Sequence, residues 1–168
     1  MIFLSVFFEP NDDQISFVDN STLTDLMSIE KIILLADDDA DDAEMFASVF
    51  SEVDPTIGVT TFTSGLGILE YLTQAAGPRP LIIFLDINMP EMTGWQCLTA
   101  LKSNASLKDI PVIMYSTSSH HRDKQLATEL GAAAFITKPS DLKTLRNILT
   151  TVSENLRNDG YRSIHKLR

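Results

Sequence analysis

The sequence predicts an α/β fold in which five strand–helix units, (βα)5, build one doubly wound parallel sheet with helices on both faces. Five short apolar segments that suit strands alternate with five segments of helical periodicity. Several strand segments, such as LIIFL at 81–85, are apolar at successive positions, as buried parallel strands are. Polar side chains follow the strands, at the sheet edge where open folds of this kind bind ligands.

Each strand is followed by a helix. The first strand, KIILLA, leads into the acidic segment ADDDADD, and the second, IGVTTFT, into TSGLG, a turn and helix start too short to be a nucleotide-binding loop. LIIFLD, IPVIMYS and AAFIT form the other strands and precede further helical segments. The predicted strands are 31–36, 57–63, 81–86, 110–116 and 133–137, and the predicted helices are 41–53, 65–76, 94–104, 121–131 and 141–157.

One domain, residues 29–157, is expected between two extensions. Residues 1–28 carry five acidic side chains and no lysine or arginine, which predicts a loosely ordered segment. Its apolar start lacks the basic beginning of a signal segment and is too short to span a bilayer, so no membrane insertion is expected. Met27 is a candidate native start, which mass spectrometry of the natively expressed protein would test. Residues 158–168 form a short basic tail, too small for a DNA-binding module.

Composition limits the partners. The formal net charge of -10 argues against general affinity for nucleic acid or anionic membranes, because both repel an acidic surface. The apolar fraction of 44% is that of a globular domain with a core. Cys97 is the single cysteine and lies in a helical segment, which predicts a buried thiol, a reducing compartment and a cytoplasmic location.

Carboxylates, hydroxyls and an ammonium group follow the predicted strands. Parallel strands end at one edge of a sheet, so these groups are expected to meet there. Three carboxylates make a hard oxygen site that suits Mg²⁺, with Mn²⁺ as an alternative, better than zinc or copper. The residues are Asp37 and Asp38 after the first strand, Asp86 after the third, Ser116 and Thr117 after the fourth, and Lys138 after the fifth.

Four segments in this order, ILLADDD, IIFLDINMPEMTGWQ, PVIMYSTSS and GAAAFITKPSD, resemble the receiver domain of two-component response regulators, a CheY-like, flavodoxin-like fold. The resemblance covers about 29–157 and is greatest to the small stand-alone bacterial receivers. It implies a signalling phosphoprotein rather than an enzyme. Its partners would be a sensor histidine kinase or histidine phosphotransfer protein and an unknown downstream protein. Monomer and weak homodimer both remain open.

The resemblance also implies residue roles at the metal and phosphoryl site. Asp86 would be the phosphoacceptor. Asp38 would bind the metal directly together with Asp86, Asp37 would act through water, and Asn88 would offer its backbone carbonyl. Lys138 would pair with the phosphoryl oxygens. From the charges alone, its ammonium is expected to face Asp86, Asp37 and Asp38 before phosphorylation and to lie within pairing distance of Asp86.

Further roles concern the response to phosphorylation. Ser116, rather than the neighbouring Thr117, aligns with the switch hydroxyl, and Phe135 aligns with the aromatic switch residue. Pro139 would follow a cis peptide bond, which proline makes accessible.

Two rival functions remain. Phosphatases of the haloacid-dehalogenase type place a second acid two residues after the nucleophile, where this chain has Asn88. A pseudo-receiver that only binds partners would normally lack the acceptor or a metal ligand. Three further acids are expected to begin a helix rather than bind metal, and two histidines are expected to be ordinary surface residues: Asp39, Asp41, Asp42, His120 and His121.

Overall fold

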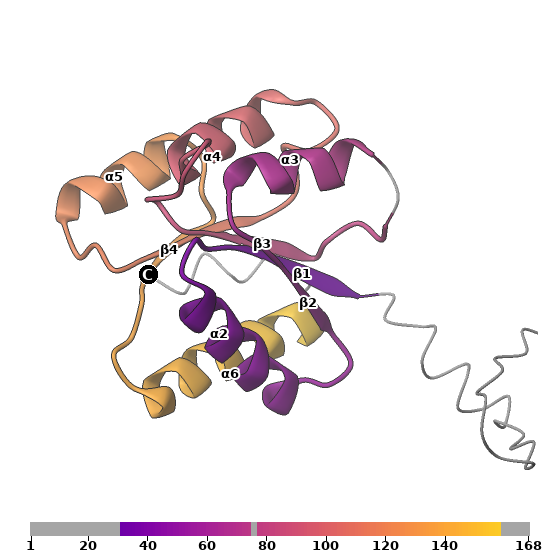
Figure 1. The fold of residues 1–168 in the computed structure, drawn as a ribbon, viewed down its shortest axis with the longest axis vertical. Helices are drawn as coiled ribbons and strands as arrows, with labels where there is room; N and C mark the ends of the chain where they lie inside the picture. The colour runs from indigo at the N-terminus through magenta and orange to yellow at the C-terminus, as the bar shows by residue number, and fades with distance from the viewer. Residues whose placement is uncertain (1–30, 75–76, 159–168) are drawn as a thin grey trace, which may run out of the picture.

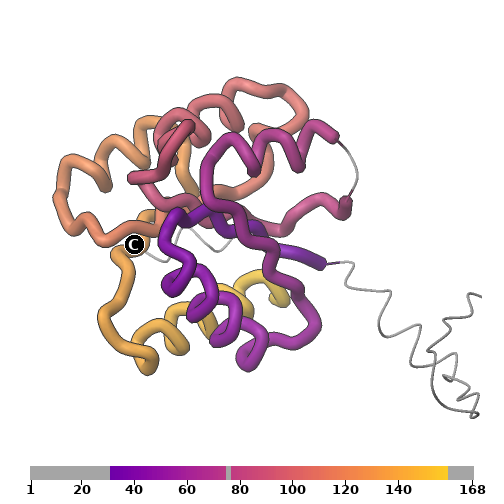
Figure 2. Tube along the Cα trace, viewed as in Figure 1, coloured from indigo at the N-terminus to yellow at the C-terminus, as the bar shows by residue number. Residues whose placement is uncertain are grey.

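The computed structural model describes residues 31–74 and 77–158, and the figures show the chain as a ribbon and as a tube (Figures 1 and 2). Within these ranges strands and helices alternate as predicted. In chain order the elements are β1 (Ile32–Ala36), α2 (Ala40–Val53), β2 (Gly58–Phe62), α3 (Gly65–Thr73), β3 (Ile82–Leu85), α4 (Gly94–Ser103), β4 (Val112–Ser116), α5 (His121–Glu129), β5 (Ala134–Thr137) and α6 (Leu142–Asn158).

The five strands form one parallel sheet in the order β2-β1-β3-β4-β5. Helices α2 and α6 cover one face, and α3, α4 and α5 cover the other (Figure 1). The predicted doubly wound (βα)5 fold is therefore confirmed. The direction in which successive strands are added reverses between β1 and β3, which makes this position the topological switch point. In open α/β sheets, ligands bind at such a switch point, beyond the carboxyl ends of the strands.

Each face of the sheet packs against its own apolar layer. All residues of β1, β3 and β4 are buried, which explains why their sequences are hydrophobic at every position except Ser116 at the end of β4. On the face of α2 and α6, the ring of Phe46 lies 4.9 Å from that of Phe84 and 5.4 Å from that of Tyr115 between ring centroids. On the other face, burial raises the pKa of the Cys97 thiol to about 12, as expected of a structural cysteine.

Local capping sets several helix ends. The side chain of Asp39 accepts hydrogen bonds from the backbone N–H of Asp41 at 3.0 Å and of Asp42 at 3.2 Å, so Asp39 is the N-cap of α2, and its predicted place at a helix start is confirmed. Helix α5 ends at Glu129, two residues before the predicted end, because Gly131 has a φ of +86° that ends a right-handed helix.

A buried carboxylate, Asp54, joins the end of α2 to α6. It accepts hydrogen bonds from Ser153 Oγ at 2.6 Å, from Thr56 Oγ1 at 2.6 Å and from Arg157 Nε at 3.0 Å. These hydrogen bonds, that of Arg157 above all, lower the pKa of Asp54 despite its burial. The sequence did not predict this cluster, because Ser153 and Arg157 lie about 100 residues from Asp54 and no local pattern links them to it.

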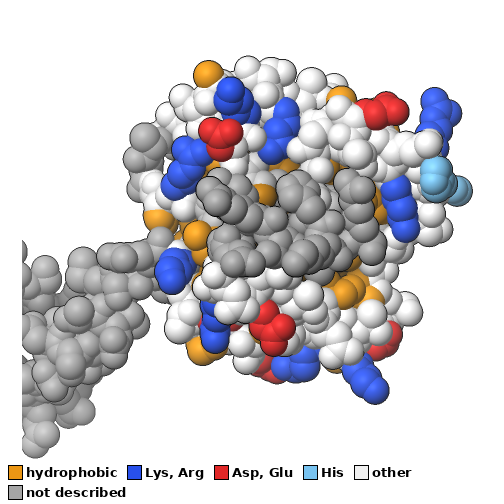
Figure 3. Space-filling view, turned by 180° about the vertical axis from the view of Figure 1, so that it is seen from behind, with side chains coloured by type: hydrophobic (Ala, Val, Ile, Leu, Met, Phe, Trp, Pro, Cys, Tyr) orange, Lys and Arg blue, Asp and Glu red, His pale blue; other side chains and the backbone are white. Residues whose placement is uncertain are grey.

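The remaining predictions concern the termini and the surface. No helix among the described residues is long and apolar enough to cross a membrane. Met27, the acidic extension through residue 28 and residues 159–168 lie outside the described ranges, whereas Asn158, the predicted start of the tail, is the last residue of α6. On the described surface seen from behind, basic and acidic side chains are intermingled with scattered hydrophobic ones (Figure 3).

Candidate functional site

The carboxyl ends of β1 and β3 bring three carboxylates together. Backbone hydrogen bonds of 2.9 Å, from Asp37 N to Phe62 O and from Asp86 N to Ala36 O, hold both aspartates in place just past their strands. Asp38 is the next residue after Asp37. Carboxylate oxygens of Asp37, Asp38 and Asp86 all lie within 4.8 Å of one another. We call these three residues the acidic triad.

The three residues of the triad differ in their exposure to solvent. Asp37 is 1% exposed and Asp86 7%, whereas Asp38 is exposed. Burial raises the pKa of Asp37, and the nearby ammonium of Lys138 opposes this rise only in part. The donor atoms are all carboxylate oxygens, so the chemistry of the triad fits a hard divalent cation such as Mg²⁺ or Mn²⁺.

The backbone around Asp86 is tightly built. Its Oδ1 accepts a hydrogen bond from Ile87 N at 2.8 Å, which orients the carboxylate. Gly94, which begins α4, donates its N–H to Ile87 O at 3.0 Å. A Cβ at position 94 would lie 2.0 Å from Asp86 O, closer than any real Cβ contact. Glycine is therefore required at this position if Asp86 is to stay where it is.

Lys138 reaches the triad from β5, but it does not pair with Asp86 as predicted. Its Nζ lies 2.6 Å from Asp37 Oδ2 and 2.9 Å from Asp42 Oδ2, and these are its ion pairs within 4.0 Å among the described residues. Burial alone would lower the pKa of Lys138, but the hydrogen bonds and charges of Asp37 and Asp42 outweigh burial and raise it. The predicted approach to Asp37 is therefore confirmed, whereas the predicted pairing with Asp86 is wrong, because Asp42 of the helix that follows β1 holds the ammonium together with Asp37.

Asp42 is thus a residue of the site that sequence analysis assigned only to the helix start. It is the third residue of α2 and lies four positions after Asp38. Helical side chains lean toward the N-terminus, so an acid in the first turn of α2 points back to the sheet edge. That spacing is the signal that could have identified it. Tyr115, also missed, lies beneath the ammonium, with its ring centroid 5.7 Å from Lys138 Nζ.

Burial distinguishes the two residues at the end of β4 that were candidates for the switch hydroxyl. Ser116 is 0% exposed, whereas Thr117 is exposed, so the inward-facing hydroxyl is that of Ser116. Ser116 Oγ accepts a hydrogen bond from Ser118 N at 3.4 Å, and Ser116 O accepts one from Lys138 N at 2.8 Å. Phe135 is half-buried on β5, in register with Met114 of β4.

Other predicted site features have mixed outcomes. No peptide bond between described residues is cis, so the predicted cis bond before Pro139 is wrong; the trans form is the more stable one even before proline, by about 0.5–1 kcal/mol. Asn88 is exposed in the loop after Asp86, and its part as a carbonyl ligand stays a prediction. His120 and His121 are exposed at the start of α5.

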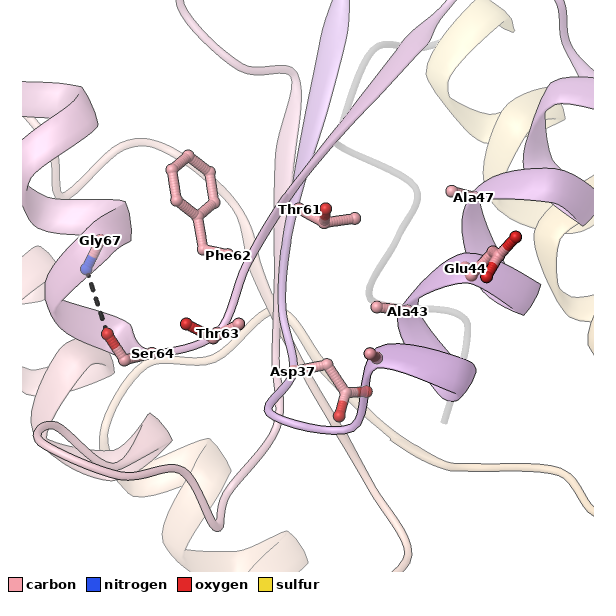
Figure 4. A pocket seen from close by; sticks show the side chains of 10 residues that line it. Asp37, Ala43, Glu44, Ala47, Thr61, Phe62, Thr63, Ser64 and Gly67 are labelled. Carbon is pink, nitrogen blue, oxygen red and sulfur yellow. Dashed lines mark hydrogen bonds between the residues drawn. The ribbon is translucent and has the colours of Figure 1, made fainter.

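An open groove of about 580 Å³ runs beside the triad (Figure 4). Asp37 lies at one end of it, next to the start of α2. Thr61 of β2 lies on one side and Ala43 and Ala47 of α2 on the other. The small side chains of α2 therefore leave Thr61 of the edge strand β2 exposed next to the site.

Fold and site together define a doubly wound α/β protein with an acidic ligand site at its topological switch point. The chain belongs to the response regulator receiver domain family, which matches residues 33–150. Receiver domains of this family act in two-component signalling.

Known relatives agree with this assignment. Response regulator Rcp1 from Synechocystis sp. is 31% identical over 127 residues, which are 73% of this chain and 86% of that protein. The solved structure of its Mn(2+)-bound form has a TM-score of 0.67 at 30% identity and covers 77% of this chain and 96% of that chain. The phosphorylated cyanobacterial phytochrome response regulator RcpA has a TM-score of 0.69 at 31% identity and covers 74% of this chain and 92% of that chain.

Proposed function

We propose that this chain is a phosphorylation-dependent response regulator that accepts a phosphoryl group on Asp86. The donor would be a phosphohistidine on a sensor histidine kinase or histidine phosphotransfer protein, and the output would be altered binding to a downstream protein. The observation that carries the proposal is the acidic triad, whose carboxylate oxygens lie within 4.8 Å of one another beside a buried lysine. The relatives named above, one Mn(2+)-bound and one phosphorylated, support it.

Asp86 would act as the nucleophile. Because Ile87 N holds Oδ1, we assign the attack on phosphorus to Oδ2. The new O–P bond would form as the P–N bond to the donor histidine breaks, and the electron pair of that bond would return to the imidazole nitrogen. Asp38 and Asp86 would hold Mg²⁺, with Asp37 acting through water and Asn88 through its carbonyl. When bound, Mg²⁺ would neutralise oxygens of the transferring group.

The remaining residues would bind and report the phosphoryl group. The ammonium of Lys138 would pair with one phosphoryl oxygen. The buried hydroxyl of Ser116 would donate to another, and Phe135 on the next strand would turn toward the space that the hydroxyl leaves. A local change of charge would thereby alter the surface formed by α5, β5 and α6.

Acetyl phosphate with Mg²⁺ tests the proposal on the wild-type protein. We expect at most one phosphoryl group per chain, followed by slow hydrolysis, with intact-mass spectrometry as the measurement. Multiple turnover of phosphomonoesters would instead indicate the phosphatase. No uptake of acetyl phosphate and no binding of beryllofluoride, a phosphoryl mimic, would indicate the pseudo-receiver.

Metal binding gives a separate prediction. Asp38→Ala should weaken Mg²⁺ binding by about tenfold or more, because it removes an exposed carboxylate of the triad. Asp41→Ala is the matched control, since it removes the same charge three residues away from an exposed position outside the triad. Isothermal titration would measure both, and equal losses would contradict the assignment of Asp38.

A further inference from the structure

Lys138 is held by two carboxylates in different environments. Asp37 belongs to the triad and its side chain is 0% exposed, whereas Asp42 comes from α2 and its side chain is 34% exposed. The ammonium is nearly enclosed, with 8% of the Lys138 side chain exposed. The helix start fixes the backbone of Asp42, whose N–H donates to the N-cap Asp39. Asp42 therefore reaches Lys138 from a fixed position outside the acidic triad.

Pairing with a phosphoryl group on Asp86 would draw the ammonium of Lys138 toward Asp86, which is not among its ion-pair partners within 4.0 Å, and away from one of its two carboxylates. Its Nζ lies 2.6 Å from Asp37 Oδ2 and donates a hydrogen bond to Asp42 Oδ2 at 2.9 Å, and the ring centroid of Tyr115 lies 5.7 Å away. Releasing Asp37 would leave a fully buried carboxylate without its cation, which is costly. Releasing Asp42 is cheaper, because its partly exposed carboxylate can be solvated by water.

We propose that Asp42 is a positioning residue that holds Lys138 away from Asp86 in the resting protein, and that a phosphoryl oxygen replaces Asp42 as the partner of Lys138. This inference rests on the proposed function. The exchange swaps one ion pair for another, and the ammonium keeps its three protons throughout. Asp42 thus acts as a brake, because phosphorylation has to draw Lys138 away from it.

A simpler explanation is that Asp42 only adds negative charge at the start of α2. Asp41 separates the two explanations, because it lies in the same helical turn and has the same charge, but it is exposed and makes no ion pair with Lys138. Asp42→Asn and Asp41→Asn remove equal charge from that turn and lose equal interaction with the helix dipole. Only Asp42→Asn weakens the hold on Lys138.

Phosphorylation rates with acetyl phosphate at saturating Mg²⁺ form the first measurement. We expect Asp42→Asn to react about three to ten times faster than Asp41→Asn, since a freed Lys138 pairs more readily with the transferring group. Beryllofluoride should bind Asp42→Asn more tightly by a similar factor. Asp42→Ala, which removes the acceptor altogether, should react at least as fast as Asp42→Asn. Hydrolysis of the phosphorylated form should change little, since Lys138 is already engaged in that state.

Two further measurements isolate the contact. In a Lys138→Ala background, Asp42→Asn and Asp41→Asn should react at the same rate, because no ammonium remains to be released. In metal-free protein, the ammonium signal of Lys138 in proton–nitrogen NMR spectra should shift in Asp42→Asn and stay in place in Asp41→Asn.

The outcomes distinguish the inference from the function on which it rests. If the wild-type protein takes up neither the phosphoryl group nor beryllofluoride, the proposed function fails and the brake fails with it. If the wild type reacts but Asp42→Asn and Asp42→Ala react no faster than Asp41→Asn, only the brake is overturned. The brake would also be overturned if Asp42→Asn reacted faster than Asp41→Asn by the same factor in the Lys138→Ala background as in the wild-type background. The effect would then come from charge alone.

Discussion

Asp86→Asn should fold normally and take up no phosphoryl group, with a rate at least about a thousandfold below that of the wild type, because an amide oxygen is a poor nucleophile. The substitution is nearly isosteric, and the amide oxygen can still accept the hydrogen bond of Ile87 N. It also removes one of three acids whose oxygens lie within 4.8 Å of one another. Stability should therefore stay level or rise, by about 1 kcal/mol at most.

Intact-mass spectrometry after incubation with acetyl phosphate and Mg²⁺ measures the first effect, and denaturant unfolding measures the second. Asp41→Asn is the control, since it removes an exposed acid outside the triad and should be phosphorylated normally. A phosphorylated Asp86→Asn at wild-type level would place the acceptor at another residue.

Lys138→Ala should lower the free energy of unfolding by about 3 kcal/mol near neutral pH, because it leaves buried Asp37 without its cation. Its affinity for Mg²⁺ should nevertheless equal or exceed that of the wild type, since a competing positive charge is gone. Added Mg²⁺ should restore part of the lost stability by binding the folded state. The phosphorylated variant should show a smaller spectral change around α5 and Phe135.

We also expect the stability of Lys138→Ala to depend on pH. The pKa of Asp37 is raised by burial even beside Lys138, and loss of the lysine should raise it further. A carboxyl group whose pKa is raised on folding favours the folded state at low pH, and this contribution is lost as the pH rises through the folded pKa. The difference in the free energy of unfolding between the wild type and Lys138→Ala should therefore become smaller as the pH falls.

Denaturant unfolding across pH, with and without Mg²⁺, tests this prediction. Lys143→Ala is the control, because Lys143 is an exposed lysine of α6 and its loss should change stability by less than about 0.5 kcal/mol. If Lys138→Ala matched Lys143→Ala in both stability and Mg²⁺ affinity, the ion pair with Asp37 would have no energetic role.

Much of this protein is determined by its sequence alone. Apolar runs such as IILLA and IIFL require strands that are buried on both faces, and they lead to a parallel sheet between two helical layers. The acids after β1 and β3 then have to meet, since parallel strands end at the same edge. The N-cap role of Asp39 could be predicted because capping depends only on neighbouring backbone groups.

Only the tertiary structure decided which acids Lys138 contacts. Its pairing with Asp42 spans 96 positions of the sequence and depends on the angle at which α2 leaves the sheet. The cluster around Asp54 is of the same kind, since Ser153 and Arg157 reach it only because α6 packs beside α2. Patterns of period two or 3.6 identify the face on which a side chain lies, but the partner of a charge on that face is set by packing between elements that are distant in the sequence.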